Sequence, residues 1–202
     1  MITSIIVRNI DSHVMYAQDG IELTSTGVSN NIFTDSNLTL INATIVHNVN
    51  VPDDFLPNAF TYVNGVFSIV DMTAYIQYRL IPAQNSKVAA LTASCATVIT
   101  AGFTSSALGA VYTYPSQLTD QQNLAASVVS SLLPSLPTGW ATPQLCMSAT
   151  GVWAYVNHTA AQIQQVGSDG KTAVLAALIH KQTLVGAVMA ATTVAQVNAI
   201  NW

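Results

Sequence analysis

Side chains able to carry acid–base or metal chemistry are few in this chain and widely spaced. Asp53 and Asp54 are adjacent in a stretch bounded by prolines, where a solvated turn explains them and a cation site is the sharper alternative. None of the histidines has a second His or a Cys at the spacing of a metal site. They are His13, His47, His158 and His180. Because His158 directly precedes a threonine that can cap a helix, we expect it at a helix entry.

Nucleophilic catalysis would need a Ser or Cys that meets a His and an acid. Beyond residue 100 the only acids are Asp120 and Asp169, and Asp120 suits the first turn of a helix, where the helix dipole favours it. The glycines between residues 102 and 151 are isolated, so no glycine-rich phosphate loop is expected. The sequence therefore predicts no catalytic residue, no cofactor-binding residue and no metal ligand, in a protein that is not an enzyme.

Aromatic side chains are frequent in the middle of the C-terminal half. Such rings more often form a core or anchor a protein interface, and a small sugar-binding platform is the alternative. They are Tyr112, Tyr114, Trp140, Trp153 and Tyr155. Two cysteines, Cys95 and Cys146, lie far apart among apolar neighbours, which predicts buried thiols and no disulfide.

The whole chain is poor in charge. Charged residues make up 7% of its 202 residues, against about 25% in an ordinary soluble domain. The five Lys and Arg residues form no cluster, which argues against nucleic-acid binding. A chain that lacks a charged coat is usually embedded in a membrane or in a permanent assembly.

A membrane span is the less favoured of these two. The best candidate, residues 172–195, is interrupted by His180 and Lys181, and its first apolar run is shorter than the roughly 20 residues that spanning requires. We expect two short buried helices there and no membrane span. The first residues lack a basic segment, so no secretory signal is expected either.

The composition changes near residue 85 and predicts an α+β protein with two domains. Residues 1–82 contain seven of the nine acidic residues and many β-formers, and we expect a β-rich attachment domain of antiparallel hairpins. Strands are predicted at residues 2–7 and 39–46, with loop at 25–37 and a turn at 52–57. The clearest hairpin joins residues 60–63 to 66–69 through Asn64 and Gly65, a pair that suits a type I′ turn. Residues 82–86 are predicted to be the linker.

Residues 86–202 are predicted to form a mainly helical domain with a small β-hairpin. Ser86 can cap a helix that runs to residue 101, and residues 103–114 are expected to be irregular. Capping boxes at residues 119–122 and 159–162 predict two further helices, the first ended by Pro134. A hairpin is predicted between them at 145–147 and 152–156. Glycines at 167 and 170 predict a break in the second helix, residues 193–196 can cap a last helix, and Trp202 can act as an apolar plug.

Several short motifs in the C-terminal half carry a resemblance to a known family. They are Cys95, residues 101–109 (AGFTSSALG), 112–115 (YTYP), 119–124 (TDQQNL), 158–162 (HTAAQ) and 193–200 (TVAQVNAI). The stretch from about residue 90 to Trp202 resembles a domain of uncharacterised function found in tail proteins of bacteriophages and prophages of Gram-negative bacteria. Residues 51–55 and 60–65 resemble a companion segment that is common in these tail proteins.

The resemblance implies a structural virion protein: a tail fibre, a baseplate protein or an adaptor that supports host attachment. Its implied partners are other phage tail proteins, including fibre, baseplate or tail tube, and further copies of itself in a homo-oligomer. Its implied location is the virion tail, after synthesis in the cytoplasm of the bacterial host. The family offers no catalytic residues to transfer. The alternatives are a tail-fibre assembly chaperone and a tail-associated module that binds host glycan.

Overall fold

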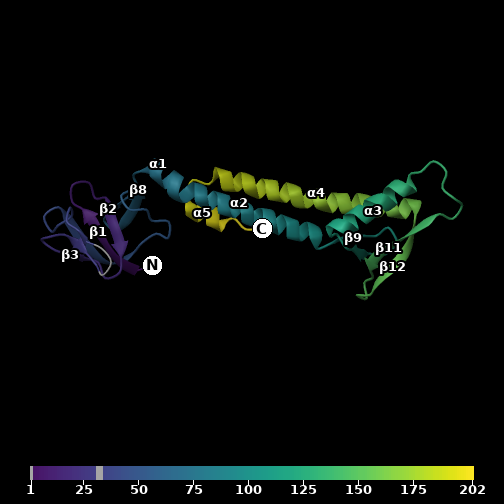
Figure 1. Ribbon diagram of the computed structural model, residues 1–202, viewed down its shortest axis with the longest axis horizontal. Coiled ribbons are helices and arrows are strands. Elements are labelled where there is room, and N and C mark those ends of the chain that lie inside the picture. Colours follow the sequence, from purple (N-terminus) through teal and green to yellow (C-terminus); the bar gives the residue numbers. More distant parts are fainter. Residues whose placement is uncertain (1, 31–33) are drawn as a thin grey trace. The chain divides into compact units, whose positions relative to one another are not determined.

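The computed structural model describes residues 2–30 and 34–202 and divides into two compact units. The first unit combines Met1–Ser86 with Ala191–Ala199, and the second combines Lys87–Ala190 with Ile200–Trp202. Antiparallel strands dominate the N-terminal half and helices the C-terminal half, so the predicted α+β class is confirmed (Figure 1).

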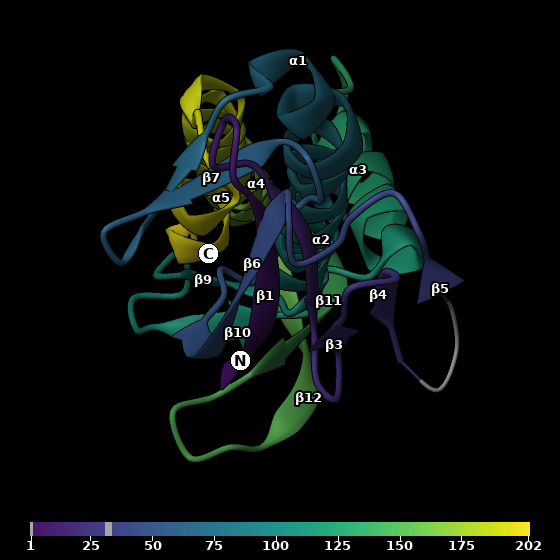
Figure 2. The same cartoon turned by 90° about the vertical axis from the view of Figure 1, so that its left-hand side faces the viewer.

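The first unit is built on a three-stranded antiparallel sheet. Its central strand β1 (Ile2–Arg8) pairs with β2 (Val14–Gln18) and β6 (Ala43–Asn50), in the order β2-β1-β6. Figure 2 shows β1 and β6 side by side. Side chains alternate between the faces of a strand, and Ile5 and Ile6 are both fully buried, in separate core clusters. The sheet is therefore covered on both faces. The predicted strand at 39–46 begins later than expected, because residues 39–42 form a turn.

Two smaller sheets complete the strands of this unit. Strands β3 (Glu22–Leu23), β4 (Val28–Ser29) and β5 (Thr34–Asp35) form one, and β4 and β5 lie where loop had been expected at 25–37. Residues 31–33 of that predicted loop lie outside the described residues. The predicted hairpin is confirmed as β7 (Phe60–Val63) and β8 (Val66–Ile69). Asn64 and Gly65 have φ angles of 51° and 85°, as a type I′ turn demands.

The predicted linker at residues 82–86 is wrong, because a helical segment runs through it. Helix α1 (Met72–Tyr75), a π-helical turn η1 (Ile76–Leu80) and helix α2 (Ile81–Thr100) follow one another without interruption. Pro82 has no N–H, but the Ile81 N–H already bonds to the Ile76 carbonyl in the wider π pattern, so the ladder is loosened just before the proline. Helix α2 therefore does not begin at Ser86, although it ends next to Gly102 as expected.

The second unit contains a four-stranded antiparallel sheet in the order β12-β11-β10-β9. Strands β11 (Ala141–Met147) and β12 (Trp153–Thr159) are the predicted hairpin with longer arms. Strands β9 (Phe103–Ser105) and β10 (Tyr112–Tyr114) occupy the stretch predicted to be irregular. That prediction failed because both strands have only three residues, and β10 gains a second partner, β11, that is distant in sequence.

Helix α3 (Leu118–Ser131) begins one residue before the predicted capping box, and its N-cap is Gln117, two residues before the predicted cap Thr119. The Gln117 N–H donates to the Asp120 carboxylate over 2.9 Å, so Asp120 acts at the third helical position and Thr119 is not the cap. The helix ends before Pro134, as expected. Asp120 does lie in the first turn.

Helix α4 (Ala160–Ala190) is continuous, so the predicted break and the predicted pair of short buried helices are both wrong. The predicted box at its start is confirmed: Gln162 Oε1 accepts from the Thr159 N–H over 2.9 Å. A Cβ added to Gly167 would lie 2.7 Å from Val128 Cγ2, and one added to Gly170 would lie 2.8 Å from Phe103 Cζ. Both glycines admit neighbouring side chains to the helix surface, and the packing offsets their low helix propensity.

The last helix, α5 (Val194–Ala199), is capped as predicted. Thr193 Oγ1 accepts from the Gln196 N–H, and Gln196 Oε1 accepts from the Thr193 N–H, both over 3.2 Å. The Val194 N–H donates to the Tyr75 hydroxyl, so α5 belongs to the first unit. Trp202 is not a buried plug: it is 38% exposed and contacts the edge of the His180 ring.

Candidate functional site

The most enclosed polar group of the second unit is His158, which is fully buried at the end of β12. Its Nδ1 lies 2.8 Å from the Val156 carbonyl, which can only accept, so Nδ1 carries the proton. Its Nε2 therefore accepts from the Tyr114 hydroxyl, also at 2.8 Å. His158 lies at a helix entry as predicted, directly before the Thr159 cap of α4, and strand alternation turns its side chain into the core.

Burial sets the protonation state of this cluster. It lowers the pKa of His158, since the charged imidazolium loses its hydration, and raises the pKa values of Tyr114 and Cys146. A neutral histidine, a protonated tyrosine and a protonated thiol together stabilise a packed interior. The prediction that both cysteines are buried free thiols is confirmed.

Of the acidic pair Asp53 and Asp54 in the first unit, Asp54 accepts a hydrogen bond from a tyrosine. The Tyr75 hydroxyl donates to Asp54 Oδ2 over 2.6 Å, and burial together with this bond raises the pKa of Tyr75 to about 12. The Asp54 carboxylate therefore fixes the start of the helical segment. Among the described residues, no group of three or more His, Cys, Asp or Glu side chains is placed to hold a metal ion.

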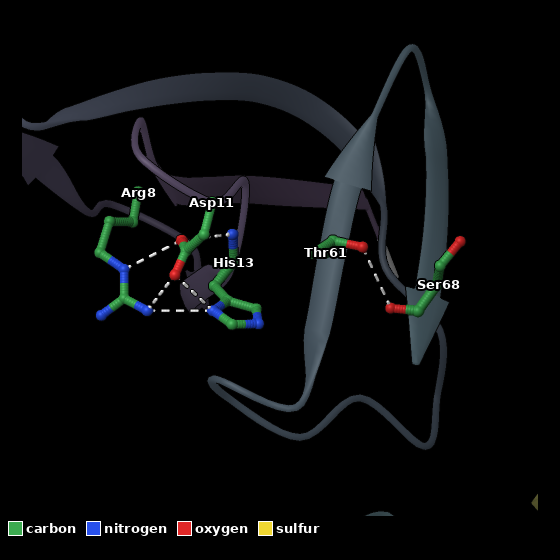
Figure 3. A network of polar contacts seen from close by, with 5 residues as sticks. All are labelled: Arg8, Asp11, His13, Thr61 and Ser68. Carbon is green, nitrogen blue, oxygen red and sulfur yellow. Dashed lines mark hydrogen bonds and ion pairs between the residues drawn. The ribbon is translucent and has the colours of Figure 1, made fainter. Parts of the chain in front are cut away.

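A second polar network lies at the turn between β1 and β2 (Figure 3). Asp11 accepts from the Arg8 guanidinium, which holds the pKa of this carboxyl well below its usual range. His13 Nδ1 lies 2.8 Å from Asp11 Oδ2 and 3.0 Å from Arg8 Nη2. The neighbouring Thr61 hydroxyl donates to the Ser68 carbonyl over 3.4 Å and not to His13. These contacts order an exposed turn.

The aromatic residues predicted as one cluster are separated by the fold. Tyr114 is fully buried, and Tyr112 and Trp140 pack on the same core. Trp153 and Tyr155 point outward from β12, where Tyr155 is 73% exposed. Of these five aromatic residues, Trp153 and Tyr155 are therefore the two that are exposed.

A polar groove of about 380 Å³ lies between α3 and the hairpin β11–β12. Tyr155 forms part of its wall, together with Asn123, Ser127 and Thr142. Gln144 also lines it and is only 7% exposed. Sequence analysis missed this groove, because its residues come from separate elements.

The second unit also exposes apolar surface. A groove of about 410 Å³ runs between α3 and α4, lined by Leu124, Val128 and Val174. Large apolar side chains are also exposed elsewhere along these two helices. They are Val129, Leu132 and Leu133 near the end of α3, and Leu175, Leu178, Ile179 and Met189 on α4.

Helix α4 is also long and apolar enough to cross a membrane, judged by length and composition alone. Its most apolar window has a mean hydropathy of 1.5, and only 11% of that window is buried. A helix at the centre of a globular protein would be mostly buried, so α4 presents much of its apolar surface outward.

Residues 82–201 match a family model described as "Domain of unknown function (DUF4376)". The chain belongs to this family. The match begins in α2 and includes the buried His158 cluster, both grooves and helix α4. Comparison with curated proteins and with solved structures gave no match.

Within this domain, Tyr114, Cys146 and His158 meet in the buried interior. The exposed side chains are mostly apolar or neutral and polar, and Lys171 is among the few charged ones. Such a surface can contact other proteins over a wide area without the cost of desolvating charges.

Proposed function

We propose that this protein is a structural component of a bacteriophage tail, as a fibre, baseplate or adaptor protein, and that it acts through protein–protein assembly. One observation carries the proposal: a helical domain almost free of charge leaves large apolar side chains bare along α3 and α4. Permanent interfaces are the more hydrophobic kind, because their partners need no free soluble state. The resemblance of the C-terminal half to phage tail proteins supports the same function.

Mass spectrometry of purified virions tests this proposal. A structural component should be present in stoichiometric copies with the other tail proteins. Absence from virions, together with co-purification on the fibre during expression, would contradict it and favour a fibre assembly chaperone. Absence from both would contradict a role in the tail altogether.

A host-glycan binding module is the second candidate, and the polar groove favours it. Amides and hydroxyls line the groove beside an exposed aromatic ring, together with the carboxylate of Asp120, and such groups suit the hydroxyls of a sugar. Tyr155 offers the ring face. This activity is compatible with a place in a tail.

A glycan array probed with the folded protein tests the second candidate. We expect any hit to be lost in Tyr155→Ala and Gln144→Leu, whereas Trp153→Ala should keep it, because Trp153 does not line the groove. No binding by the folded wild-type protein would remove the candidate. Binding that survives both groove substitutions would place the sugar elsewhere.

A further inference from the structure

Strand β12 forms one end of the four-stranded sheet in the second unit (Figure 1). It pairs with β11 along its whole length, from Trp153 to Thr159, without any shift of register. No strand lies on its other side. The edge of a sheet presents backbone N–H and C=O groups with which a further strand can pair.

The hydrogen bonds of the hairpin show which residues of β12 face this edge. The Ser148 N–H donates to the Val152 carbonyl over 3.0 Å. Hydrogen-bonded and non-hydrogen-bonded pairs alternate along antiparallel strands, so the even-numbered residues of β12 bond to β11 and the odd-numbered ones turn their backbone groups away from it. The backbone groups of Trp153, Tyr155 and Asn157 are here called the open edge.

Three observations agree with this assignment. Pro143 lies opposite Asn157, in a pair that needs no hydrogen bond between the two strands, and proline has no N–H to donate there. The backbone–backbone hydrogen bonds that described residues make outside helices and strands include none at the three residues of the open edge. The Thr159 N–H donates to Gln162 Oε1 over 2.9 Å, so the open edge ends at Asn157.

The other sheet edges of the molecule are protected against pairing. In the first unit, the register of edge strand β6 against β1 shifts between Thr3 and Ile5, and its Asn48 has a φ of 57°. On the opposite edge, the Val14 carbonyl of β2 accepts from the Asn58 N–H over 2.8 Å. Strand β9, at the far end of the second unit's sheet, has only three residues. Strand β12 has seven, and none of them is proline, glycine or charged, so it lacks the usual protection.

The open edge is complementary to itself. When a second copy of β12 lies antiparallel with Tyr155 opposite its own equivalent, Trp153 lies opposite Asn157, and each of these pairs exchanges both of its hydrogen bonds. Every backbone group of the open edge then has a partner. A two-fold contact also brings each residue on the axis against its own copy, where like charges repel. Residues 141–159 contain no Asp, Glu, Lys or Arg, so the contact forms without repulsion within the hairpin.

A second copy suits this edge better than an unstructured peptide does. A flexible segment loses backbone entropy when it becomes a strand, whereas β12 is already held in an extended conformation by β11. The open edge is also short, because the turn at Gly151 limits it on one side and the Thr159 cap on the other. A copy of β12 has the same length of free edge, so neither strand leaves backbone groups unpaired.

We propose that β12 joins two copies of this chain by antiparallel strand pairing centred on Tyr155, which makes the two four-stranded sheets one continuous sheet. The exposed rings of Trp153 and Tyr155, 47% and 73% accessible in the single chain, lie at this contact. Aromatic side chains on neighbouring strands stabilise such a pair. The inference rests on the proposed assembly function, and names one surface of assembly and its partner.

The molar mass of the purified full-length chain tests the proposal. We expect twice the 21.3 kDa of one chain, measured by light scattering after size exclusion. Tyr155→Pro removes the N–H at the centre of the contact and should reduce the mass to that of one chain. Pairing with β11 should persist, because an edge strand tolerates a proline whose nitrogen faces solvent. The matched variant Tyr155→Ala removes the ring but keeps the N–H, and should keep the mass of two chains. Circular dichroism should be alike for all three proteins.

Cross-linking tests the register and needs no proline. In the proposed pair, the two Cα atoms at position 155 lie about 5.5 Å apart, within the range of a disulfide. The two Cα atoms at position 153 are offset by four residues, or roughly 14 Å along the strands. We therefore expect oxidation to give a covalent dimer of Tyr155→Cys and not of Trp153→Cys. The native Cys95 and Cys146 are buried in both variants.

Four results would overturn the inference. They are a monomeric wild-type chain, a Tyr155→Pro variant that keeps the mass of two chains, a Tyr155→Ala variant that is monomeric, and equal cross-linking at positions 153 and 155. A wild-type mass that grows beyond two chains with concentration, and is lost in Tyr155→Pro, would assign β12 to a head-to-tail contact and also overturn it. Virion content is independent: a monomer found in virions refutes the strand pairing alone, and a β12-linked dimer absent from them refutes the tail function alone.

Discussion

On both faces of α4, residues recur at spacings of three and four, but one face is buried within the chain and the other is exposed. On the inner face, Ile163 is fully buried and Gly170 admits an aromatic ring, so the helix surface is shaped to its neighbours. On the outer face, Ile179 is 62% exposed and Gly186 has nothing within 4 Å of an added Cβ. A repeat of three and four residues thus shows that a helix face is to be packed, and only the structure shows whether its own chain does the packing.

The largest contrast is expected between two isoleucines of this helix. Ile163→Ala should lower the free energy of unfolding by about 3 kcal/mol, because it removes buried contacts and leaves a cavity. Ile179→Ala should change it by less than about 0.5 kcal/mol in protein dilute enough to be monomeric. Urea denaturation measures both. Equal losses would mean that the outer face is covered within the monomer.

Replacing two glycines of α4 by alanine should change the stability of the protein in opposite directions. Gly170→Ala places a methyl group 2.8 Å from the Phe103 ring and should destabilise the fold by about 2 kcal/mol. Gly186→Ala adds a methyl group in open space and should stabilise the monomer by roughly 0.5–1 kcal/mol through its higher helix propensity. Thermal unfolding of the two variants against wild type gives the sign of each. A stabilising Gly170→Ala would show that the ring moves aside freely.

These glycines also mark the limit of sequence reasoning here. Local propensity predicted a break at 167–170, because the space that each glycine provides is filled by Val128 and Phe103, which are distant in sequence. The linker predicted at Pro82 was wrong for a similar reason, because the π-helical turn before the proline keeps the helical segment continuous. By contrast, the hairpin at Asn64 and the caps at Thr159 and Thr193 depend on neighbouring residues alone, and their predictions are confirmed.

The candidate surfaces follow the same rule. The exposed outer face of α4 is contained in one helix, but the sequence predicted two short buried helices there. The polar groove and the pair formed by Tyr114 and His158 join elements that meet only in the folded chain. No spacing rule could connect residues 44 positions apart.

A third contrast compares a buried tyrosine with an exposed one in the second unit. Tyr114→Phe leaves the buried Nε2 of His158 without its donor and should cost about 1–2 kcal/mol. Tyr155→Phe removes a hydroxyl from a side chain that is 73% exposed and should have an effect within about 0.5 kcal/mol. Denaturant midpoints at equal slope measure the difference. A cost at Tyr155 equal to that at Tyr114 would contradict the assignment of interior and surface.

The smallest effect is a pH dependence that only the buried histidine should produce. Burial lowers the pKa of His158 in the folded chain, whereas the unfolded chain titrates it near its ordinary value of about 6.5. As the pH falls below that value, the unfolded chain binds a proton that the folded chain binds less readily, so this contribution to stability is complete above about pH 6.5 and is lost on acidification. The lowered carboxyl pKa values of Asp11 and Asp35 act only in more acidic solution.

We therefore expect wild-type protein to lose stability between pH 7.5 and pH 5, and His158→Gln to lose less over the same interval even if it is less stable throughout. His180→Gln, which alters an exposed ring, is the control and should keep the wild-type slope. Urea midpoints across the interval give both slopes. If the stability of His158→Gln and of wild type changes alike with pH, the buried imidazole is not the group that titrates. The protonation of His158 would then differ from the one inferred from its contact with the Val156 carbonyl.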